Sequence, residues 1–546
     1  MYPTVVSVSL FVYWALSLIP NLYFSEFFVM SNRPLVLNFS ASDSAGLAGM
    51  AMDIRSQCAM GVHSLSVVTA NTAQNNDAVI SVNPVDEPVF NDQLSALAEL
   101  PFKAIKVGLL GAEYQCERIA DFLLSGAFSK GSIPVVFDPV LGSSSGSRFL
   151  SDIFIDKIKS SLLPMTSLLT PNIAEAERLS GHTIRSHREV ELAANTLLGL
   201  GVKAVLIKGG HFEASESDQV EDYFSDGARS FWLSNKKIKT HNSRGTGCAL
   251  SSSIASSLAL HYSVYDAVVI GRMAISQALR QGYSLGRFSS DHFLSEKVGD
   301  NRVYGPVCIT HFPNEQIDLP CLTRHPLVSA KALSVAKPFP ECNQPLLGLY
   351  PVVDRAEWIK VLAESGITTI QLREKTLTGQ ALEAEIVEAI RMAQKHNIRL
   401  FINDHWQLAV KHRAYGVHLG QEDLDDADIP QIQAAGLRLG ISTHCHYEVA
   451  RAHAHRPSYI ACGPVYHTNT KDMPWVPHGL KGLSYWRKVL QYPLVAIGGI
   501  NQARFDKVAA IGVDSVAMIT AITLADEPAA IAKNFSVRFE KNKNTV

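Results

Sequence analysis

Two aspartates in the C-terminal third of the chain, Asp404 and Asp423, each follow a short apolar segment. Paired carboxylates with open coordination positions suit Mg2+ that is shared with substrate phosphates. Arg373 and Lys375 end an earlier apolar segment, and Lys471 follows a later one. If these segments end on one rim, three cations surround the carboxylates and predict a pyrophosphate site, with Arg373 and Lys471 in catalytic roles. Solvated charges at strand ends are the alternative for any one of these residues alone.

A second group of residues near the C-terminus predicts a phosphate site. Gly498 and Gly499 follow one apolar segment, and Ile519 and Thr520 end the next. Backbone N–H groups at such positions bind phosphate in many barrels. One pyrophosphate site and one phosphate site imply two phosphorylated substrates.

The elements that must position these residues form an eightfold repeat. Eight apolar segments end near residues 354, 371–375, 403–404, 421–423, 442–443, 463–466, 498–499 and 520–521, with helical segments such as 382–396 between them. This alternation predicts a (β/α)8 TIM barrel. The active site of such a barrel lies at the carboxyl ends of its strands, where the charged residues occur here.

The sharpest local signal in the first half is Arg244-Gly245-Thr246-Gly247-Cys248, which opens a helical segment at 251–260. Glycines at a helix N-terminus leave backbone N–H groups free to bind an anion. A thiol at that position, Cys248, is expected to have a lowered pKa. A tight strand-to-helix turn would also select glycine, and a small buried residue is the ordinary alternative for an isolated cysteine.

In the first half, strand and helix segments alternate in the way that is typical of a doubly wound α/β sheet. Apolar strands are expected at 35–39, 65–69, 104–108, 134–138, 167–170 and 204–207, with helices at 50–60 and 189–200 among the segments between them. Asp138 and Asn172 fall at strand ends, where Asp-Pro and Pro-Asn are also common turn residues.

Composition favours a globular enzyme that acts on small molecules. The 546 residues are 47% hydrophobic and 18% charged with a formal net charge of -2, so nothing predicts a nucleic-acid partner. The eight cysteines contain no CxxC pair and no metal-ligand spacing, which favours a cytoplasmic location over a disulfide-rich secreted one. A homo-oligomer is compatible with these features.

We expect four parts along the chain. Residues 1–29 are a hydrophobic extension, read as sequence upstream of a true start at Met30, with an uncleaved membrane segment as the alternative. Residues 30–300 form the first domain, and residues 346–540 form the barrel. The prolines of residues 301–345 oppose regular structure and predict a linker.

The order of motifs in the first half resembles the ribokinase-like kinases. The motifs are Asp138-Pro139-Val140, Thr170-Pro171-Asn172, Lys208-Gly209-Gly210 and the glycine turn at residues 244–248. When Thr72-Ala73-Gln74-Asn75 is added, the set is most similar to the hydroxymethylpyrimidine and phosphomethylpyrimidine kinases of thiamine synthesis.

The resemblance implies a role for each matching residue. Asp53 and Gln74 would bind the pyrimidine, Gly245 and Gly247 would form the anion hole, and Cys248 would act as base. ATP and Mg2+ would be held by Asn172, Glu175, Lys208, Gly210 and Thr246.

The turn at residues 42–49, which follows the first strand and is called the opening turn below, departs from the family pattern because Leu47 stands where glycine is usual. Two alternatives therefore stay open for this domain: a pyrimidine-binding regulatory module, or a related vitamin kinase of the pyridoxal type.

The second half resembles thiamine-phosphate synthase over residues 346–535. Five motifs match in order: Gln371-Leu372-Arg373-Glu374-Lys375, Ile402-Asn403-Asp404, His418 to Asp423, Gly463 to Lys471, and Ala496 to Ile500. The resemblance implies Mg2+ at Asp404 and Asp423. It places the pyrimidine pyrophosphate at Gln371, Arg373, Glu374, Lys375, Asn403, Ser442 and Lys471. It places the thiazole phosphate at Thr468, Thr470, Gly499, Ile519 and Thr520. The whole chain would then be a bifunctional enzyme of thiamine synthesis.

Overall fold

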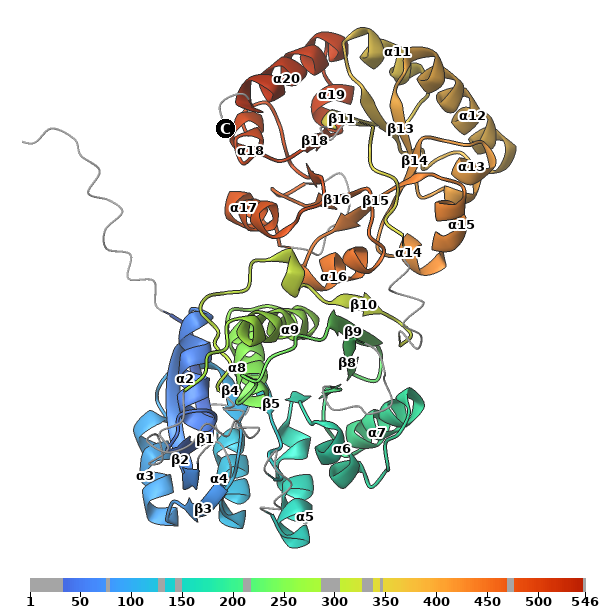
Figure 1. Cartoon of the computed structure of the whole chain (residues 1–546). Helices are drawn as coiled ribbons and strands as arrows, with labels where there is room; N and C mark the ends of the chain where they lie inside the picture. Colours follow the sequence, from blue (N-terminus) through green and yellow to red (C-terminus); the bar gives the residue numbers. More distant parts are fainter. Residues whose placement is uncertain are drawn as a thin grey trace, which may run out of the picture.

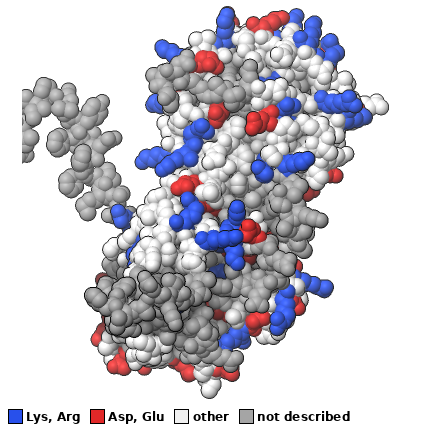
Figure 2. Space-filling model, in the orientation of Figure 1, with Lys and Arg blue, Asp and Glu red and all other residues white. Residues whose placement is uncertain are grey.

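The computed structural model describes two α/β domains, one above the other in Figure 1. The described residues are 33–74, 79–125, 133–142, 150–209, 218–285, 305–326, 337–343, 347–468 and 476–543. The extension at 1–29 lies outside them. Over the described residues, no helix is both long enough and apolar enough to cross a membrane. Figure 2 shows acidic and basic side chains interspersed over one face of both domains.

The N-terminal domain is built on a ten-stranded sheet in the order β10-β9-β8-β7-β6-β5-β4-β1-β2-β3. The strands from β7 to β2 in that order are parallel, and β8, β9 and β10 on one edge and β3 on the other are antiparallel. The strands are β1 (Leu35–Asp43), β2 (His63–Gln74), β3 (Val79–Pro84), β4 (Phe102–Val107), β5 (Val135–Phe137), β6 (Leu168–Leu169), β7 (Val205–Ile207), β8 (Gln219–Ser225), β9 (Ser230–Lys236) and β10 (Cys321–Thr323).

Helices cover both faces of this sheet, which confirms the predicted fold class. Val36 of β1 packs in one apolar core and the next residue, Leu37, in the other, because successive side chains of a strand point to opposite faces. The helices are α2 (Gly49–Ala59), α3 (Glu87–Leu97), α4 (Glu113–Leu124), α5 (Asp152–Ser161), α6 (Ile173–Ser180), α7 (His187–Gly199), α8 (Thr246–Ala259) and α9 (Val264–Arg280).

Helix α8 is buried although it is rich in serine. Ser253 donates to the carbonyl of Ala249 at 2.7 Å, and Ser256 donates to the carbonyl of Ser252 at 2.7 Å. These bonds to the preceding turn satisfy the hydroxyl groups inside the helix. The small side chains therefore let α8 pack closely against α9, α2 and β4.

The stretch predicted as a linker has more structure than its prolines suggest. Cys321–Thr323 forms β10 on the edge of the N-terminal sheet, with Leu322 buried. Asp318, which is fully buried, forms an ion pair with Arg280 of α9 at 2.6 Å. The expectation of an irregular linker is wrong for this part, because an edge strand of a sheet can gain a partner from any extended segment that lies beside it.

The C-terminal domain is the predicted (β/α)8 barrel. Its strands close in sequence order, from β11 (Gly348–Val353) through β12 (Thr369–Leu372), β13 (Arg399–Asn403), β14 (Gly416–Leu419), β15 (Arg438–Thr443), β16 (Tyr459–Cys462) and β17 (Leu494–Ala496) to β18 (Ser515–Met518). Its helices are α11 (Glu357–Glu364), α12 (Gly379–His396), α13 (Trp406–Lys411), α14 (Asp423–Asp426), α15 (Ile429–Ala434), α16 (His446–Ala454), α17 (Gly479–Val489), α18 (Phe505–Ala509), α19 (Thr520–Thr523) and α20 (Pro528–Lys543).

The barrel interior is filled by aromatic side chains that pack above glycines. A Cβ on Gly440 would lie 2.1 Å from the ring of Tyr459, and one on Gly416 would lie 2.5 Å from the ring of Phe401. Glycine at these two strand positions therefore makes room for the large residues of the neighbouring strands.

The two domains meet where α16 of the barrel faces α9 and β10 of the N-terminal domain (Figure 1). Asp266, in the first turn of α9, accepts a hydrogen bond from the backbone N–H of Tyr447 in the first turn of α16, at 2.9 Å. The aromatic ring of Tyr262 packs against that of His446 with centroids 5.3 Å apart, and Tyr485 donates to the carbonyl of Pro313. One buried apolar cluster therefore continues through both domains.

Candidate functional site

The carboxyl ends of the barrel strands surround a cavity of about 1690 Å3. It is lined by most of the residues that the sequence predicts for this site: Gln371, Arg373, Lys375, Asn403, Asp404, Asp423, Ser442, Thr468, Gly499, Ile519 and Thr520. Thr470 and Lys471 lie outside the described residues. The eightfold repeat thus brings residues that are up to about 150 positions apart to one rim.

Asp404 and Asp423 are neighbours at this rim, as predicted. Burial alone would raise the pKa of Asp404, but an ion pair with Lys375 outweighs it and the pKa is lowered. Burial and the carboxylate of Asp404 both raise the pKa of Asp423. Asp404 also has a φ of +62°, a left-handed conformation that is uncommon for a residue other than glycine and is found most often at functional sites.

Two carboxyl groups in contact repel each other unless one of them is protonated or a cation lies between them. The carboxylate of Asp404 contributes to the raised pKa of Asp423, so the two groups act on each other. The pair therefore fits a divalent cation such as Mg2+, for which carboxylate oxygens are preferred ligands. Among the described residues there is no group of three or more His, Cys, Asp or Glu side chains that could hold a metal ion alone. Water or substrate oxygens would have to complete the coordination.

Arg373 provides a guanidinium that has no partner among the described residues. Its backbone N–H donates to the carbonyl of Val353 at 2.7 Å, which fixes the residue at the end of β12. Its half-buried side chain lines the cavity and has no hydrogen bond or ion pair with any described residue. A guanidinium with free donors in a partly buried cavity is suited to bind phosphate in a bidentate manner.

Glu374 does not line the cavity, although the sequence predicts it among the substrate-binding residues. Its side chain is 3% exposed and accepts hydrogen bonds from the backbone N–H groups of Thr376 and Leu377 and from the Thr376 hydroxyl. Burial would raise the pKa of Glu374, but these bonds and Arg355 lower it to about 2. Glu374 therefore shapes the loop that carries Arg373 and Lys375 instead of binding a ligand directly.

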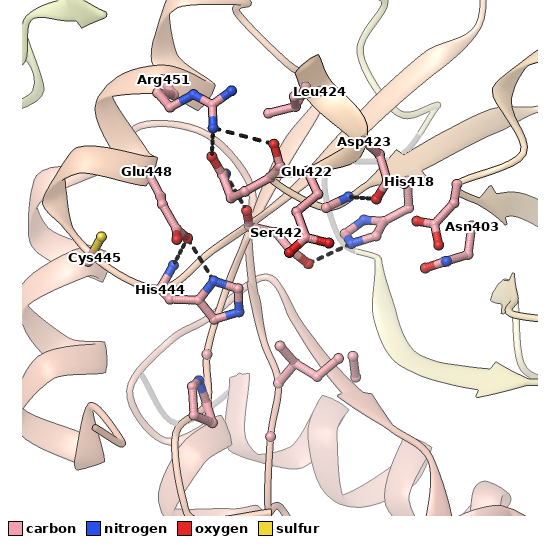
Figure 3. A pocket seen from close by; sticks show the side chains of 18 of the residues that line it. Asn403, His418, Glu422, Asp423, Leu424, Ser442, His444, Cys445, Glu448 and Arg451 are labelled. Carbon is pink, nitrogen blue, oxygen red and sulfur yellow. Dashed lines mark hydrogen bonds and ion pairs between the residues drawn. The ribbon is translucent and has the colours of Figure 1, made fainter. Parts of the chain in front are cut away.

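Ser442 is held in place by a hydrogen-bonded chain through the barrel core. Its hydroxyl lies 2.8 Å from Nε2 of His418 (Figure 3). Nδ1 of His418 lies 2.8 Å from the hydroxyl of Tyr459. Tyr459 in turn contacts the hydroxyl of Tyr350 at 2.9 Å. Burial lowers the pKa of His418 to about 4, so this ring is neutral at physiological pH and orients Ser442 without adding charge.

A second group of hydrogen bonds supports the same strand end from its outer side. Gln421 donates to the carbonyl of Ser442 at 2.7 Å, and Arg451 of α16 donates to the side-chain oxygen of Gln421 at 3.2 Å. In the same region, His444 and Glu448 form a hydrogen bond of 2.7 Å (Figure 3). The sequence analysis missed these supporting residues, because their contacts depend on how α16 packs on the strands.

The glycines predicted for the phosphate site have conformations that require glycine. Gly498 has a φ of +99° and Gly499 a φ of +63°, and a Cβ on Gly499 would lie 2.4 Å from the carbonyl oxygen of His467. Arg504 donates to the carbonyl of Gly499 at 2.8 Å and covers the ring of Tyr466. This backbone can approach an anion closely and has a cation beside it.

In the N-terminal domain, the predicted nucleotide-binding residues also meet at the carboxyl edge of the sheet. Lys208 Nζ lies 2.7 Å from Oδ1 of Asp138 and 4.0 Å from Oε2 of Glu175. Asn172 and Glu175 cap α6 reciprocally, with hydrogen bonds of 2.8 and 2.9 Å. A Cβ on Gly247 would lie 3.2 Å from Asp138 and 3.5 Å from Lys208, so the glycine turn faces this cluster. Gly210 lies outside the described residues.

Cys248 follows this turn, but its thiol does not have the lowered pKa expected from the helix N-terminus. Burial raises the pKa of Cys248 to about 11, and the nearby ammonium of Lys106 offsets only part of that effect. At neutral pH the side chain is therefore a thiol. The loss of solvation outweighs the helix dipole here, because Asp53 and Asp138 also disfavour a negative charge.

Asp53 is paired with a lysine inside the N-terminal domain. Its side chain is completely buried and accepts hydrogen bonds from Lys106 at 2.9 Å, from Ser252 at 2.7 Å and from Ser40. Burial would lower the pKa of Lys106, but Asp53 outweighs it and the pKa of Lys106 is raised. The predicted role of Asp53 in binding the pyrimidine stays a prediction, and the contacts on the carboxylate favour a structural role instead. The residue neutralises a lysine inside the domain, and a lysine within the apolar strand β4 was the signal that could have indicated this.

Asp43, at the end of β1, organises the opening turn. Its carboxylate accepts the N–H groups of Ala45, Leu47 and Ala48, each at 2.8 Å. The Leu47 side chain is buried, and the residue is not among those with a positive φ. Ser44 then joins the turn to Gln74 through hydrogen bonds with both backbone groups of Gln74. The turn is therefore well ordered with leucine at position 47.

Comparison with known proteins agrees with both halves of this description. Residues 43–291 match the family model for phosphomethylpyrimidine kinase, and residues 349–522 match the model for thiamine monophosphate synthase. The thiamine-phosphate synthase of Salmonella typhimurium is 56% identical over 180 residues, which cover 33% of this chain and 85% of that protein. The enzyme of Yersinia pseudotuberculosis is 56% identical over 190 residues, covering 35% of this chain and 88% of that protein.

Among solved structures, the phosphomethylpyrimidine kinase of Clostridium difficile 630 is 30% identical, covers 45% of this chain and 99% of its own, and has a TM-score of 0.40. The pyridoxal kinase of Staphylococcus aureus is 24% identical, covers 53% of this chain and 97% of its own, and has a TM-score of 0.45. Through its barrel the chain belongs to the thiamine-phosphate synthase family, and it joins to that barrel a domain of the phosphomethylpyrimidine kinase family.

Proposed function

We propose that this chain carries out two consecutive steps of thiamine synthesis. The N-terminal domain phosphorylates 4-amino-5-hydroxymethyl-2-methylpyrimidine and then its monophosphate, with ATP as co-substrate. The barrel condenses the resulting pyrophosphate with hydroxyethylthiazole phosphate to thiamine phosphate and pyrophosphate. The observation that carries this proposal is that Arg373, which has no side-chain partner within the described part of the chain, lines the same cavity as the Asp404–Asp423 pair, an arrangement suited to a pyrophosphate leaving group and its cation.

In the barrel reaction, the bond between the pyrimidine methylene carbon and the pyrophosphate oxygen breaks, and a bond from the thiazole nitrogen to that carbon forms. Arg373 and Lys375 bind the departing pyrophosphate, while Ser442, held by His418, orients the pyrimidine. Asp404 and Asp423 would hold Mg2+, which supplies positive charge to the leaving group. The residues thus contribute positioning and electrostatic stabilisation, and no protein nucleophile is needed.

In the kinase reaction, the backbone N–H groups from Gly245 to Cys248 face the transferring phosphoryl group. Lys208 and Glu175 would hold the nucleotide phosphates and their Mg2+. Because burial raises the pKa of Cys248 to about 11, its side chain is mostly a neutral thiol, which cannot accept a proton. Cys248 can therefore act as base only in the fraction of molecules in which it is a thiolate, and otherwise the substrate proton leaves on an oxygen of the phosphoryl group. Gln74 would bind the pyrimidine.

The division into an extension at 1–29, a kinase domain at 30–300, a linker at 301–345 and a synthase barrel at 346–540 is part of this proposal, with β10 as the segment that attaches the linker to the kinase sheet. We also propose a cytoplasmic location. The alternatives for the first domain, a binding module or a pyridoxal-type kinase, are not favoured, since residues 43–291 match the phosphomethylpyrimidine kinase model.

The test supplies the purified full chain with hydroxymethylpyrimidine, thiazole phosphate, ATP and Mg2+, and runs a parallel reaction that starts from the pyrimidine pyrophosphate. Both should yield thiamine phosphate. Product from the parallel reaction alone would refute the kinase assignment and leave the synthase assignment standing.

Two variants assign the sites. Arg373→Ala should lower product formation about 100-fold or more in both reactions, because it removes a donor to the leaving group. Lys208→Ala should impair only the reaction that starts from hydroxymethylpyrimidine. Arg391→Ala is the matched control, since this residue lies on the outer face of α12 in an exposed pair with Glu388. Full synthase activity in Arg373→Ala would show that the barrel site is wrongly placed.

A further inference from the structure

The cavity at the barrel mouth is closed on one side by the N-terminal domain. Its lining includes Arg229 and Tyr265, which lie near the end of the β8–β9 turn and in α9, and Arg324 and His325, which follow β10. Its volume of about 1690 Å3 exceeds the roughly 300–1000 Å3 that is usual for a small-molecule site. The cavity therefore has room for more than the synthase site, and the additional volume lies between the barrel mouth and the residues of the N-terminal domain.

Arg229 is an exposed cation of this junction, and aromatic rings from both domains lie against it. Its guanidinium carbon lies 4.7 Å from the ring centre of Tyr265 in the N-terminal domain and 5.3 Å from that of Tyr447 in the barrel. Its backbone N–H is fixed by Asp226 at 2.7 Å. Within the described part of the chain, its side chain forms no ion pair and no hydrogen bond. A guanidinium held against aromatic rings keeps its N–H edges available for an anion.

Arginines and carboxylates both lie on the wall around Arg229. Arg324 lies 2.6 Å from Oδ2 of Asp425, and Arg451 of α16 binds Oδ1 of the same carboxylate. One carboxylate therefore serves two arginines, and Asp226, which accepts the backbone N–H of Arg229 and the hydroxyl of Tyr265, adds a further negative charge. Glu422 and Glu448 line the barrel side of the cavity, and Glu448 is bonded to His444.

The kinase turn and one contact between the domains lie at opposite ends of α8. The turn is at the N-terminus of α8, where Gly247 faces Asp138. The other end of α8 leads into Tyr262, which packs on His446 of the barrel. A helix of 14 residues spans roughly 21 Å, which is the separation of the kinase turn from this contact.

We propose that Arg229, Tyr265 and Tyr447 form an entrance subsite that binds the phosphorylated aminopyrimidine before it reaches Arg373. The inference rests on the proposed function and adds a role for the N-terminal domain in the synthase reaction. The guanidinium takes the phosphate groups, and the tyrosine rings offer a flat apolar surface to the pyrimidine. Positive charge at the mouth of a cavity raises the capture rate of an anionic substrate.

The test measures the synthase reaction of the full chain at several salt concentrations, with each of the two substrates varied in turn. Arg229→Gln should lower kcat/KM for the pyrimidine pyrophosphate about 3- to 10-fold at low ionic strength and leave kcat nearly unchanged. Arg229→Glu should lower it further, and both differences should shrink at high salt. Arg188→Gln and Arg188→Glu, on the exposed surface of α7, make the same charge changes away from the cavity.

Each other outcome overturns the proposal. Arg229 variants that match the Arg188 controls would show that the junction does not capture the substrate. An effect confined to thiazole phosphate would assign the subsite to the other anion, and a loss of kcat that salt does not change would indicate structural damage only. A wild-type chain that makes no thiamine phosphate from saturating substrates would instead refute the proposed function itself.

Discussion

Replacing Asp53 by alanine should destabilise the N-terminal domain without a specific effect on pyrimidine binding. The carboxylate is fully buried, and its two oxygens accept bonds from Lys106, Ser252 and Ser40. Lys106 is 1% exposed and has no other ion-pair partner among the described residues. The substitution therefore leaves an ammonium group inside the protein without its counter-ion.

The expected cost follows from that arrangement. Removing one partner of a buried ion pair typically costs about 3–5 kcal/mol, because the remaining charge stays desolvated. A domain of this size has a total stability of about 5–15 kcal/mol, so the loss is a large fraction of it. At about 2–4 °C per kcal/mol, the melting temperature of the domain should fall by roughly 6 to 20 °C.

The assay is thermal unfolding of the full chain, followed by circular dichroism, beside kinase KM measurements at a temperature where the variant is folded. Asp53→Ala should lower the first transition and leave KM for hydroxymethylpyrimidine within about twofold. In the double variant Asp53→Ala, Lys106→Met most of the lost stability should return, because no charge is left unpaired. An Asp53→Ala chain with wild-type stability and a strongly raised KM would refute this reasoning and restore Asp53 as a substrate ligand.

Three further predictions concern pH and reactivity. Burial and Asp404 raise the pKa of Asp423, so the Mg2+ affinity of the synthase should begin to fall at a higher pH than an ordinary aspartate would give, and Asp404→Asn should shift that fall to lower pH; an affinity independent of pH contradicts the paired site. Burial raises the pKa of Cys248 to about 11, so iodoacetamide should label this cysteine slowly at neutral pH and faster as the pH is raised. Rapid labelling at neutral pH would show that Cys248 is a thiolate and would contradict the raised pKa. Burial raises the pKa of Glu175 from 4.5 to about 7, although the ammonium of Lys208 acts in the opposite direction. Between these two pH values the folded domain therefore holds a proton on Glu175 that the unfolded chain has released. Stability in urea should therefore decrease as the pH rises from about 4.5 to about 7. Glu175→Gln should remove this slope, and an equal slope in the variant would disprove the shift.

The barrel was predictable from sequence because its signal is repeated. Each strand ends in polar or glycine residues, and a parallel barrel gathers all such ends on one rim, so Asp404, Asp423 and Arg373 could be placed together without coordinates. The direction of a side chain within a loop was not predictable. Glu374 lies between two cavity residues in sequence and nevertheless turns toward the backbone of Thr376.

The contacts of Asp53 and the residues at the domain junction were also not predictable, because both depend on how distant parts of the chain pack together. Position in a motif does not reveal that Lys106, 53 residues later, lies against the carboxylate, since that contact depends on β4 pairing beside β1. Arg229 and Arg324 carry no local pattern at all. They line the barrel cavity only because the two domains pack with α9 against α16, and no periodicity in either half encodes that arrangement.

Asp266 closes the first turn of its own helix with Ser263 and also accepts the N–H of Tyr447 in the barrel. Cys445, at the N-cap position of that barrel helix, makes no capping bond with its side chain, so α16 takes its cap from the neighbouring domain. The Salmonella relative, 85% of which is matched by 180 residues of the barrel region, shows that a synthase can exist with little else attached. A barrel separated from the N-terminal domain would lose the cap that Asp266 supplies to α16 and would expose the aromatic rings around His446, and Cys445→Ser would offer the helix a capping residue of its own.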